Sequence, residues 1–118
     1  MPARYRGVGQ PVLVGGTMGT CSFILVGTQR GMEETFGSSI HGAGRRTSRK
    51  QALREFRGEK VIAELAGKGI AVRVHGASGV AEEAPGAYKD VERIVAVMEG
   101  AGVSRRVARL RPLVCVKG

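Results

Sequence analysis

The sequence predicts an α/β or α+β fold of mixed short strands and helices, in a single domain spanning residues 1–118. Short β-branched and apolar runs bounded by glycine alternate with stretches whose apolar residues recur at helical spacing. No internal repeat and no low-complexity linker separates them. A chain of this length removes roughly two-thirds of its unfolded surface from water on folding, which is enough for one domain. Strands that alternate with helices are typical of both fold classes.

The first part of the chain is expected to form two strands and a short helix. PVLVGG (residues 11–16) and TCSFILVG (residues 20–27) are β-branched, apolar runs bounded by glycine, which is the composition of strands. QRGMEETFG (residues 29–37) predicts a short helix that ends at its last glycine.

The next segment has no apolar period of either kind and is therefore expected to be a loop. It leads into a helix start. Ser48 and Gln51 match a capping box, and Ala52 and Phe56 follow at i and i+4, so a helix is expected from about Arg49.

The remainder of the chain predicts two more helices and two strand regions. The helical stripes are Val61, Ile62, Leu65 and Ala66, ending at Gly67, and Val91, Ile94, Val95 and Met98, ending at Gly100. IAVRVH (residues 70–75) alternates as a half-buried strand. ARLRPLVCVKG (residues 108–118) is expected to be a strand broken at its proline.

Positive charge is strongly in excess. The chain has 19 Lys and Arg against 10 Asp and Glu, a formal net charge of +9, and the basic groups gather at residues 45–57 and 105–111. Such clusters favour a polyanion, and we prefer a nucleic acid or nucleotide to an anionic membrane, which would select a basic amphipathic helix with bulky apolar residues. A solvated basic face without a ligand is the alternative.

Compartment and metal chemistry are constrained by what the sequence lacks. No apolar run approaches the ~20 residues of a membrane span, and the start MPARYRG has no apolar signal-peptide core, so we expect a cytoplasmic protein with no membrane partner. Cys21 and Cys115 have no CxxC or Cys/His spacing, which predicts no metal site and two buried, reduced thiols. The aromatic residues are too dispersed for a base-stacking platform.

One loop has the composition of a catalytic site. In GSSIHGAGRRTSRKQA (residues 37–52), His41 stands between small residues and is followed by basic ones. A neutral imidazole can attack phosphorus, and the phosphoramidate it forms is a good leaving group when protonated. Gly42 and Gly44 would let a phosphate approach the backbone, where N–H groups and Arg45 offset its charge. A turn that merely requires glycine is the alternative interpretation.

Three long stretches resemble the carboxy-terminal part of the RtcB-type RNA ligases, also called tRNA-splicing ligases. They are GGTMGTCSFILVGTQRGMEETFGSSIHGAGRRTSRKQA (residues 15–52), EEAPGAYKDVERIV (residues 82–95) and SRRVARLRPLVCVKG (residues 104–118). The resemblance implies part of the larger RtcB-like fold. It also implies an enzyme that joins an RNA 3′-phosphate or 2′,3′-cyclic phosphate to a 5′-hydroxyl, using GTP and manganese. In this family GMP is first carried on a histidine and then passed to the RNA.

The resemblance assigns expected roles residue by residue. His41 matches the histidine that becomes guanylylated, and GGTMGT stands where the family has PGSMGT, with Thr17 in place of the usual serine. The expected nucleotide-binding positions are Gly15, Gly16, Thr17, Met18, Ser22, His41, Gly42, Ala43, Gly44, Tyr88 and Lys117. The expected phosphate or RNA contacts are Arg45, Arg46, Arg49 and Lys50; only the first has a motif match, and the others could form a solvated helix face.

The resemblance also implies that this chain lacks the family's manganese ligands. The family's manganese ligands, a cysteine and several histidines, belong to a region upstream of these motifs, and His75 is interpreted as structural. Because metal bridging of phosphate oxygens is the largest electrostatic contribution to such a transfer, this chain alone is expected to be nearly inactive. The chain is interpreted as one half of a split enzyme assembled in trans, as an excised piece of a longer ligase or as a piece of a broken reading frame. Its expected partners are RNA, the upstream ligase portion and an archease-type activator. An RNA-binding module, a structural remnant without catalysis and a phosphocarrier are the alternative functions.

Overall fold

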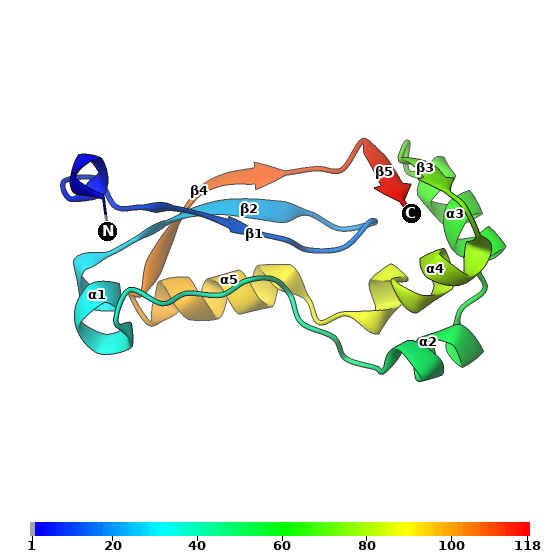
Figure 1. Cartoon of the computed structure of the whole chain (residues 1–118), viewed down its shortest axis with the longest axis horizontal. Coiled ribbons are helices and arrows are strands. Elements are labelled where there is room, and N and C mark those ends of the chain that lie inside the picture. Colours follow the sequence, from blue (N-terminus) through cyan, green and yellow to red (C-terminus); the bar gives the residue numbers. More distant parts are fainter. Residues whose placement is uncertain (1) are drawn as a thin grey trace.

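The computed structural model describes residues 2–118 and contains both helices and strands, as predicted (Figure 1). In chain order the elements are η1 (Ala3–Tyr5), β1 (Pro11–Val14), β2 (Ser22–Gly27), α1 (Gln29–Thr35), α2 (Arg49–Glu55), α3 (Gly58–Gly67), β3 (Ala71–Val74), α4 (Ala77–Glu82), η2 (Pro85–Ala87), α5 (Val91–Gly100), β4 (Ser104–Leu110) and β5 (Val114–Lys117). The molecule is elongated, with extents of 46 × 25 × 22 Å. Its radius of gyration is 16.3 Å, whereas a compact domain of this length has about 13–14 Å.

Strands β1, β2 and β4 form an antiparallel sheet in the order β1-β2-β4. Residues of β2 alternate between two faces, so that Phe23 and Leu25 are buried while Ile24 and Val26 are only partly covered. The register of β4 shifts between Ile24 and Leu25, which is a β-bulge. We call the face that carries Phe23 and Leu25 the inner face and the opposite one the outer face.

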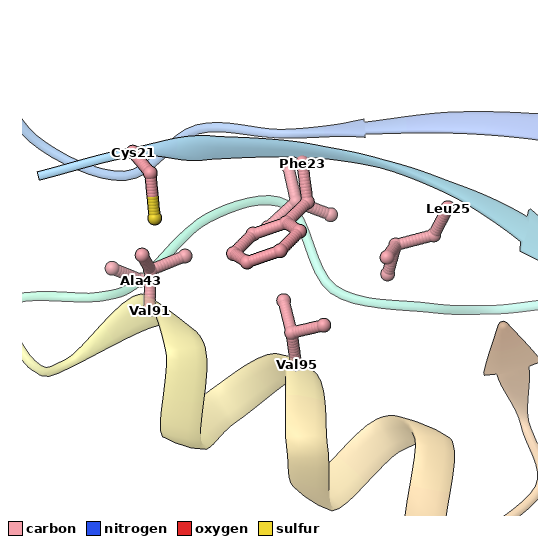
Figure 2. Close-up of a cluster of buried hydrophobic side chains, with 7 residues drawn as sticks. Cys21, Phe23, Leu25, Ala43, Val91 and Val95 are labelled. Carbon is pink, nitrogen blue, oxygen red and sulfur yellow. The ribbon is translucent and has the colours of Figure 1, made fainter. Parts of the chain in front are cut away.

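Helix α5 packs against the inner face and encloses the first hydrophobic cluster (Figure 2). Side chains of Cys21, Phe23 and Leu25 point from the β2 region toward Val91 and Val95 of α5. The buried members are Val14, Cys21, Phe23, Leu25, Ala43, Val91 and Val95. Full burial of a Val, Leu or Phe side chain contributes about 1.5–3 kcal/mol, so this contact holds α5 and the loop around Ala43 to the sheet.

The other half of the molecule is built around the parallel pair β3 and β5, with helices α3 and α4 (Figure 1). Its buried cluster consists of Met18, Val61, Leu65, Ile70, Val80 and Ala84. Met18 belongs to the turn between β1 and β2, so that turn connects the two clusters. The expectation of one domain over residues 1–118 remains a prediction, since buried clusters alone do not define a domain boundary.

Most predicted elements are present, with shifted ends. Helix α2 begins at Arg49, and the Ser48 hydroxyl accepts a 3.1 Å hydrogen bond from the Gln51 N–H. The capping box is only half formed, because the Gln51 side chain donates to Glu55. Helix α5 ends at Gly100 as predicted. The break at Pro112 separates β4 from β5, which belong to different sheets.

One element was missed and one expectation needs correction. Helix α4 was not predicted, because its six residues, ASGVAE, are too few to display a helical period. Cys21 is buried, but Cys115 is only partly buried, because it lies beside an open cavity that Lys117 and Met18 also line. Among residues 2–118, no helix has both the length and the apolarity to cross a bilayer.

Candidate functional site

A cavity of about 240 Å³ lies where the β1–β2 turn meets β5. Its lining comes from four separate stretches of the chain and comprises Gly15, Gly16, Thr17, Met18, Ser22, Glu83, Tyr88, Pro112, Val114, Cys115 and Lys117. Seven of these are positions that the sequence predicted to bind a nucleotide. The fold therefore brings together residues from distant parts of the chain, such as Gly15 and Lys117.

Hydrogen bonds within the β1–β2 turn hold its shape. The N–H of Gly16 donates to the Ser22 hydroxyl at 3.2 Å, and the N–H of Thr17 donates to the Thr20 hydroxyl at 3.1 Å. A Cβ on Gly16 would lie 1.7 Å from the Cys21 carbonyl oxygen, so no larger residue fits there. The Thr17 hydroxyl also accepts from the Gly19 N–H at 3.2 Å. Thr17, the residue that departs from the family's serine, is thus part of the turn itself.

The loop that carries His41 is joined to this turn by its backbone. Gly15 and Gly42 form an isolated parallel bridge, and the Ala43 N–H donates to the Gly15 carbonyl at 2.9 Å. A Cβ on Gly42 would lie 3.0 Å from that same oxygen. The side chain of Ala43 is buried in the first cluster, while His41 itself is exposed. His41 does not line the cavity, but it directly precedes the residue bridged to the cavity wall.

Arg45 is turned inward to the protein. Its guanidinium donates to the backbone carbonyl of Thr47 at 3.0 Å, to the Tyr88 hydroxyl at 3.2 Å and to the backbone carbonyl of Glu82. It also lies 5.0 Å from the centroid of the Tyr88 ring, within the range of a cation–π interaction. Arg45 thereby holds Tyr88 at the cavity wall. Arg46, Arg49 and Lys50 are exposed and do not line the cavity.

Lys117 extends from β5 into the cavity, and its ammonium forms an ion pair with the Glu83 carboxylate. Both side chains are largely covered, with relative exposures of 27% and 30%. Burial lowers the pKa of the Lys117 ammonium from its usual value. Burial likewise raises the pKa of the neighbouring Cys115 thiol. The cavity thus contains one compensated cation beside an uncharged thiol.

The structure separates the predicted residues into those at the cavity and those beside it. His41, Gly42, Ala43 and Gly44 lie on the adjoining loop and do not line the cavity. Sequence reasoning missed Glu83, Pro112, Val114 and Cys115, whose places follow from long-range contacts that no local pattern signals. His75, interpreted as structural, is exposed just after β3.

A larger cavity, of about 430 Å³, lies near α1 and η1. None of the predicted site residues lines it. Among residues 2–118, no group of three or more His, Cys, Asp or Glu side chains is arranged to hold a metal ion. The smaller cavity is therefore the candidate functional site, because it alone of the two unites the predicted positions.

Comparison with known proteins identifies the family. The sequence profile described as "tRNA-splicing ligase RtcB" matches residues 1–118. The chain belongs to the RtcB family. The RtcB relatives include proteins named tRNA-splicing ligase RtcB from Pyrococcus horikoshii, 54% identical, and Thermococcus kodakarensis, 53% identical. A protein of Entamoeba dispar named RNA-splicing ligase RtcB homolog 2 is 49% identical.

These RtcB relatives are much longer than the matched segment. Each comparison covers 100% of this chain, but the chain spans only 14% of the Pyrococcus protein, 24% of the Thermococcus protein and 22% of the Entamoeba protein. The structure accordingly describes an RtcB segment whose fold is consistent with part of a larger RtcB-like fold.

Proposed function

We propose that this chain is the nucleotide-binding segment of a GTP-dependent RNA ligase of the RtcB type and accepts GMP on His41. The ligase would join RNA ends that bear a 3′-phosphate or 2′,3′-cyclic phosphate to 5′-hydroxyl ends, as in tRNA splicing and RNA repair. The observation that supports this proposal is the convergence of Gly15–Met18, Ser22, Tyr88 and Lys117 on one cavity next to the His41 loop. Similarity to proteins named as RNA-joining ligases supports it independently.

The cavity is compatible with a guanine base. The Lys117 ammonium can donate to the exocyclic carbonyl oxygen of guanine, and the hydroxyls of Thr17 and Ser22 and the Glu83 carboxylate offer further polar partners. Met18 and Tyr88 supply apolar surface for a flat ring. Its volume of about 240 Å³ is below the roughly 300–1,000 Å³ of typical small-molecule sites. We infer that this segment holds the base and that other parts of the ligase complete the nucleotide site.

His41 would act as the nucleophile. One imidazole nitrogen attacks the α-phosphorus of GTP, a P–N bond forms, and the P–O bond to pyrophosphate breaks as pyrophosphate leaves. The RNA 3′-phosphate then takes GMP from His41, and the RNA 5′-hydroxyl finally displaces GMP as the RNA ends join. The exposure of His41 suits a group that must meet an RNA end. Anchoring of the adjacent Gly42 backbone to Gly15 limits the positions that the imidazole can take.

Manganese does not fit the described residues, which contain no cluster of metal-binding side chains. We therefore derive no step through the metal and propose that its ligands come from the rest of the ligase. That portion, encoded with this chain or supplied in trans, is the proposed partner, along with RNA and an archease-type activator. Without it this chain should be nearly inactive. The proposed setting is the cytoplasm, where the free thiols Cys21 and Cys115 would stay reduced.

Intact-mass measurement tests this proposal. The chain is incubated with GTP and manganese, alone and grafted in place of the matching segment of the Thermococcus kodakarensis relative, each with His41 and as His41→Ala. We expect a mass increase of one GMP in the graft with His41, almost none in the chain alone and none in either His41→Ala variant. An adduct that persists in His41→Ala would refute the assignment of the nucleophile. Absence of any adduct in an active graft would refute the covalent route.

The exposed cations Arg46, Arg49 and Lys50 also favour a second candidate, an RNA-binding segment without catalysis. This candidate predicts RNA affinity that falls steeply with salt and is unchanged by His41→Ala. A graft that binds RNA but forms no GMP adduct and joins no ends would favour it. RNA joining that depends on His41 would exclude it.

A further inference from the structure

The outer face of the β1-β2-β4 sheet is apolar, and no helix or strand among residues 2–118 covers it. By strand register it carries the rows Pro11, Val26 and Arg105, then Leu13, Ile24 and Ala108, and then Ser22 and Leu110. Leu13 is 73% exposed and Leu110 is 45% exposed. Figure 1 shows α5 on one side of this sheet and no helix or strand of the described chain on the other. Antiparallel sheets tolerate one solvated face, but such a face normally carries polar side chains.

The amount of exposed surface is too large for a self-contained domain. The accessible surface is 7636 Å², whereas a folded monomer of 12.4 kDa exposes about 6,100 Å². The difference, on the order of 1,500 Å², exceeds the roughly 800 Å² that each partner contributes to a standard protein interface. The elongated shape gives part of this difference. A partner would remove the most apolar surface from water at the uncovered face of the sheet.

Strand β5 shows the same incompleteness beside the cavity. Parallel strands are almost always covered on both faces, yet Val114 is 62% exposed and Val116 is 76% exposed in the two-stranded β3-β5 sheet. The intervening Cys115 and Lys117 point the other way, toward the second cluster and the cavity. A protein partner that covers Val114 and Val116 would therefore also fix the position of β5, the strand that carries Lys117.

The chemistry of the outer face selects the kind of partner. In the three cross-strand rows Arg105 is the single cation, so this surface lacks the clustered positive charge that RNA or an anionic membrane would require. An apolar centre is typical of permanent protein interfaces. The rest of a longer ligase could cover this face, because the relatives that contain this segment are several times longer than the segment itself.

We propose that the outer face of the β1-β2-β4 sheet, centred on Leu13, together with the exposed valines of β5, is the docking surface for the remainder of an RtcB-type ligase. This inference rests on the proposed function for the identity of the partner but not for the location of the surface. Docking there removes the apolar face from water and fixes the position of β5 next to the nucleotide cavity. The outer face is thus an internal interface of the complete enzyme.

Cysteine accessibility tests the surface without nucleotide, metal or RNA. In a Cys115→Ser background, Leu13→Cys and Leu110→Cys are placed singly in the isolated chain and in the Thermococcus graft, and maleimide labelling rates are compared. We expect both positions to label rapidly in the isolated chain and at least about tenfold more slowly in the graft, because a packed position reacts only when it opens. Val97→Cys is the matched control, since Val97 is 66% exposed on α5, away from the outer face.

Each result has a definite meaning. Leu13→Cys that labels equally fast in the graft and in the isolated chain overturns the proposal. So does equal protection of Val97→Cys, which would indicate general shielding. Protection of Leu13→Cys already in the isolated chain, with the elution volume of a dimer, would assign the face to a second copy and also overturn it. Since His41→Ala should not change any of these rates, failure of the docking surface and failure of guanylylation can be distinguished.

Discussion

The backbone N–H of Ala43 donates a 2.9 Å hydrogen bond to the carbonyl oxygen of Gly15. This contact joins the loop of His41 to the turn that forms one wall of the candidate nucleotide cavity. It involves only backbone atoms, so its geometry depends on the small size of the residues around it. The placement of the proposed nucleophile therefore rests on glycine, not on a side-chain hydrogen bond.

Gly42→Ala should displace His41 while leaving the rest of the fold intact. The added Cβ would lie 3.0 Å from the Gly15 oxygen and push the two segments apart. Because misplacement of a reacting group by about 1 Å can cost ~100-fold in rate, we expect GMP transfer to fall by ten- to a hundredfold in the graft. The measurement is the rate of GMP adduct formation by intact mass. Gly67→Ala, where a Cβ contacts nothing within 4 Å, should leave the rate unchanged.

Gly16→Ala should destabilise the isolated chain, whereas Gly15→Ala should not. A Cβ at Gly16 would lie 1.7 Å from the Cys21 carbonyl, while one at Gly15 meets nothing within 4 Å. Overpacking of this kind costs about 1–3 kcal/mol, and each kcal/mol lowers the melting temperature of a domain this size by roughly 4–8 °C. Thermal unfolding followed by circular dichroism measures both variants. Equal melting temperatures would show that the turn relaxes without cost.

Arg45 and Arg46 should differ in stability although they are neighbours of the same charge. Arg45→Met leaves the Glu82 carbonyl and the Tyr88 hydroxyl without their donor, and loss of such partly buried bonds costs about 1–3 kcal/mol. Arg46 is exposed, so Arg46→Met should change stability by less than about 0.5 kcal/mol. Urea unfolding of both variants provides the comparison. A similar midpoint for Arg45→Met and the unmodified chain would contradict the inward role of Arg45.

Cys115 should report on occupancy of the cavity. Burial raises its pKa above the usual 9.0, so less thiolate is present at any given pH and alkylation should be slower than for an exposed thiol. Below this pKa the rate should rise about tenfold per pH unit, and it should still be rising at pH 9. We expect GTP to slow alkylation of Cys115 in the graft, while buried Cys21 stays unlabelled without denaturant. Alkylation unaffected by saturating GTP would mean that the nucleotide binds elsewhere.

Local sequence patterns were sufficient for most secondary structure. Ser48 at the start of α2 and the stripe of Val91 and Val95 in α5 predict their helices from spacing alone, since a capping side chain and a helical period act within one or two turns. The short helix α4 was missed for the same reason, because six residues cannot show a period. Seven of the positions that the sequence motifs predicted to bind a nucleotide are gathered by the fold at one cavity.

The side-chain pairs at the site depend on contacts between distant residues, so only the tertiary structure revealed them. The guanidinium of Arg45 donates to the Tyr88 hydroxyl and the Glu82 carbonyl, two partners 43 and 37 positions away that no local pattern signals. Glu83 had no signal in the sequence, and it pairs with Lys117 only because β5 lies beside β3. The sequence by itself determined most helices and strands and the residue types expected at the site, because these follow from local periodicity and residue type. Which groups pair, and which apolar face is left uncovered, follows from strand register and packing, which only the folded chain defines.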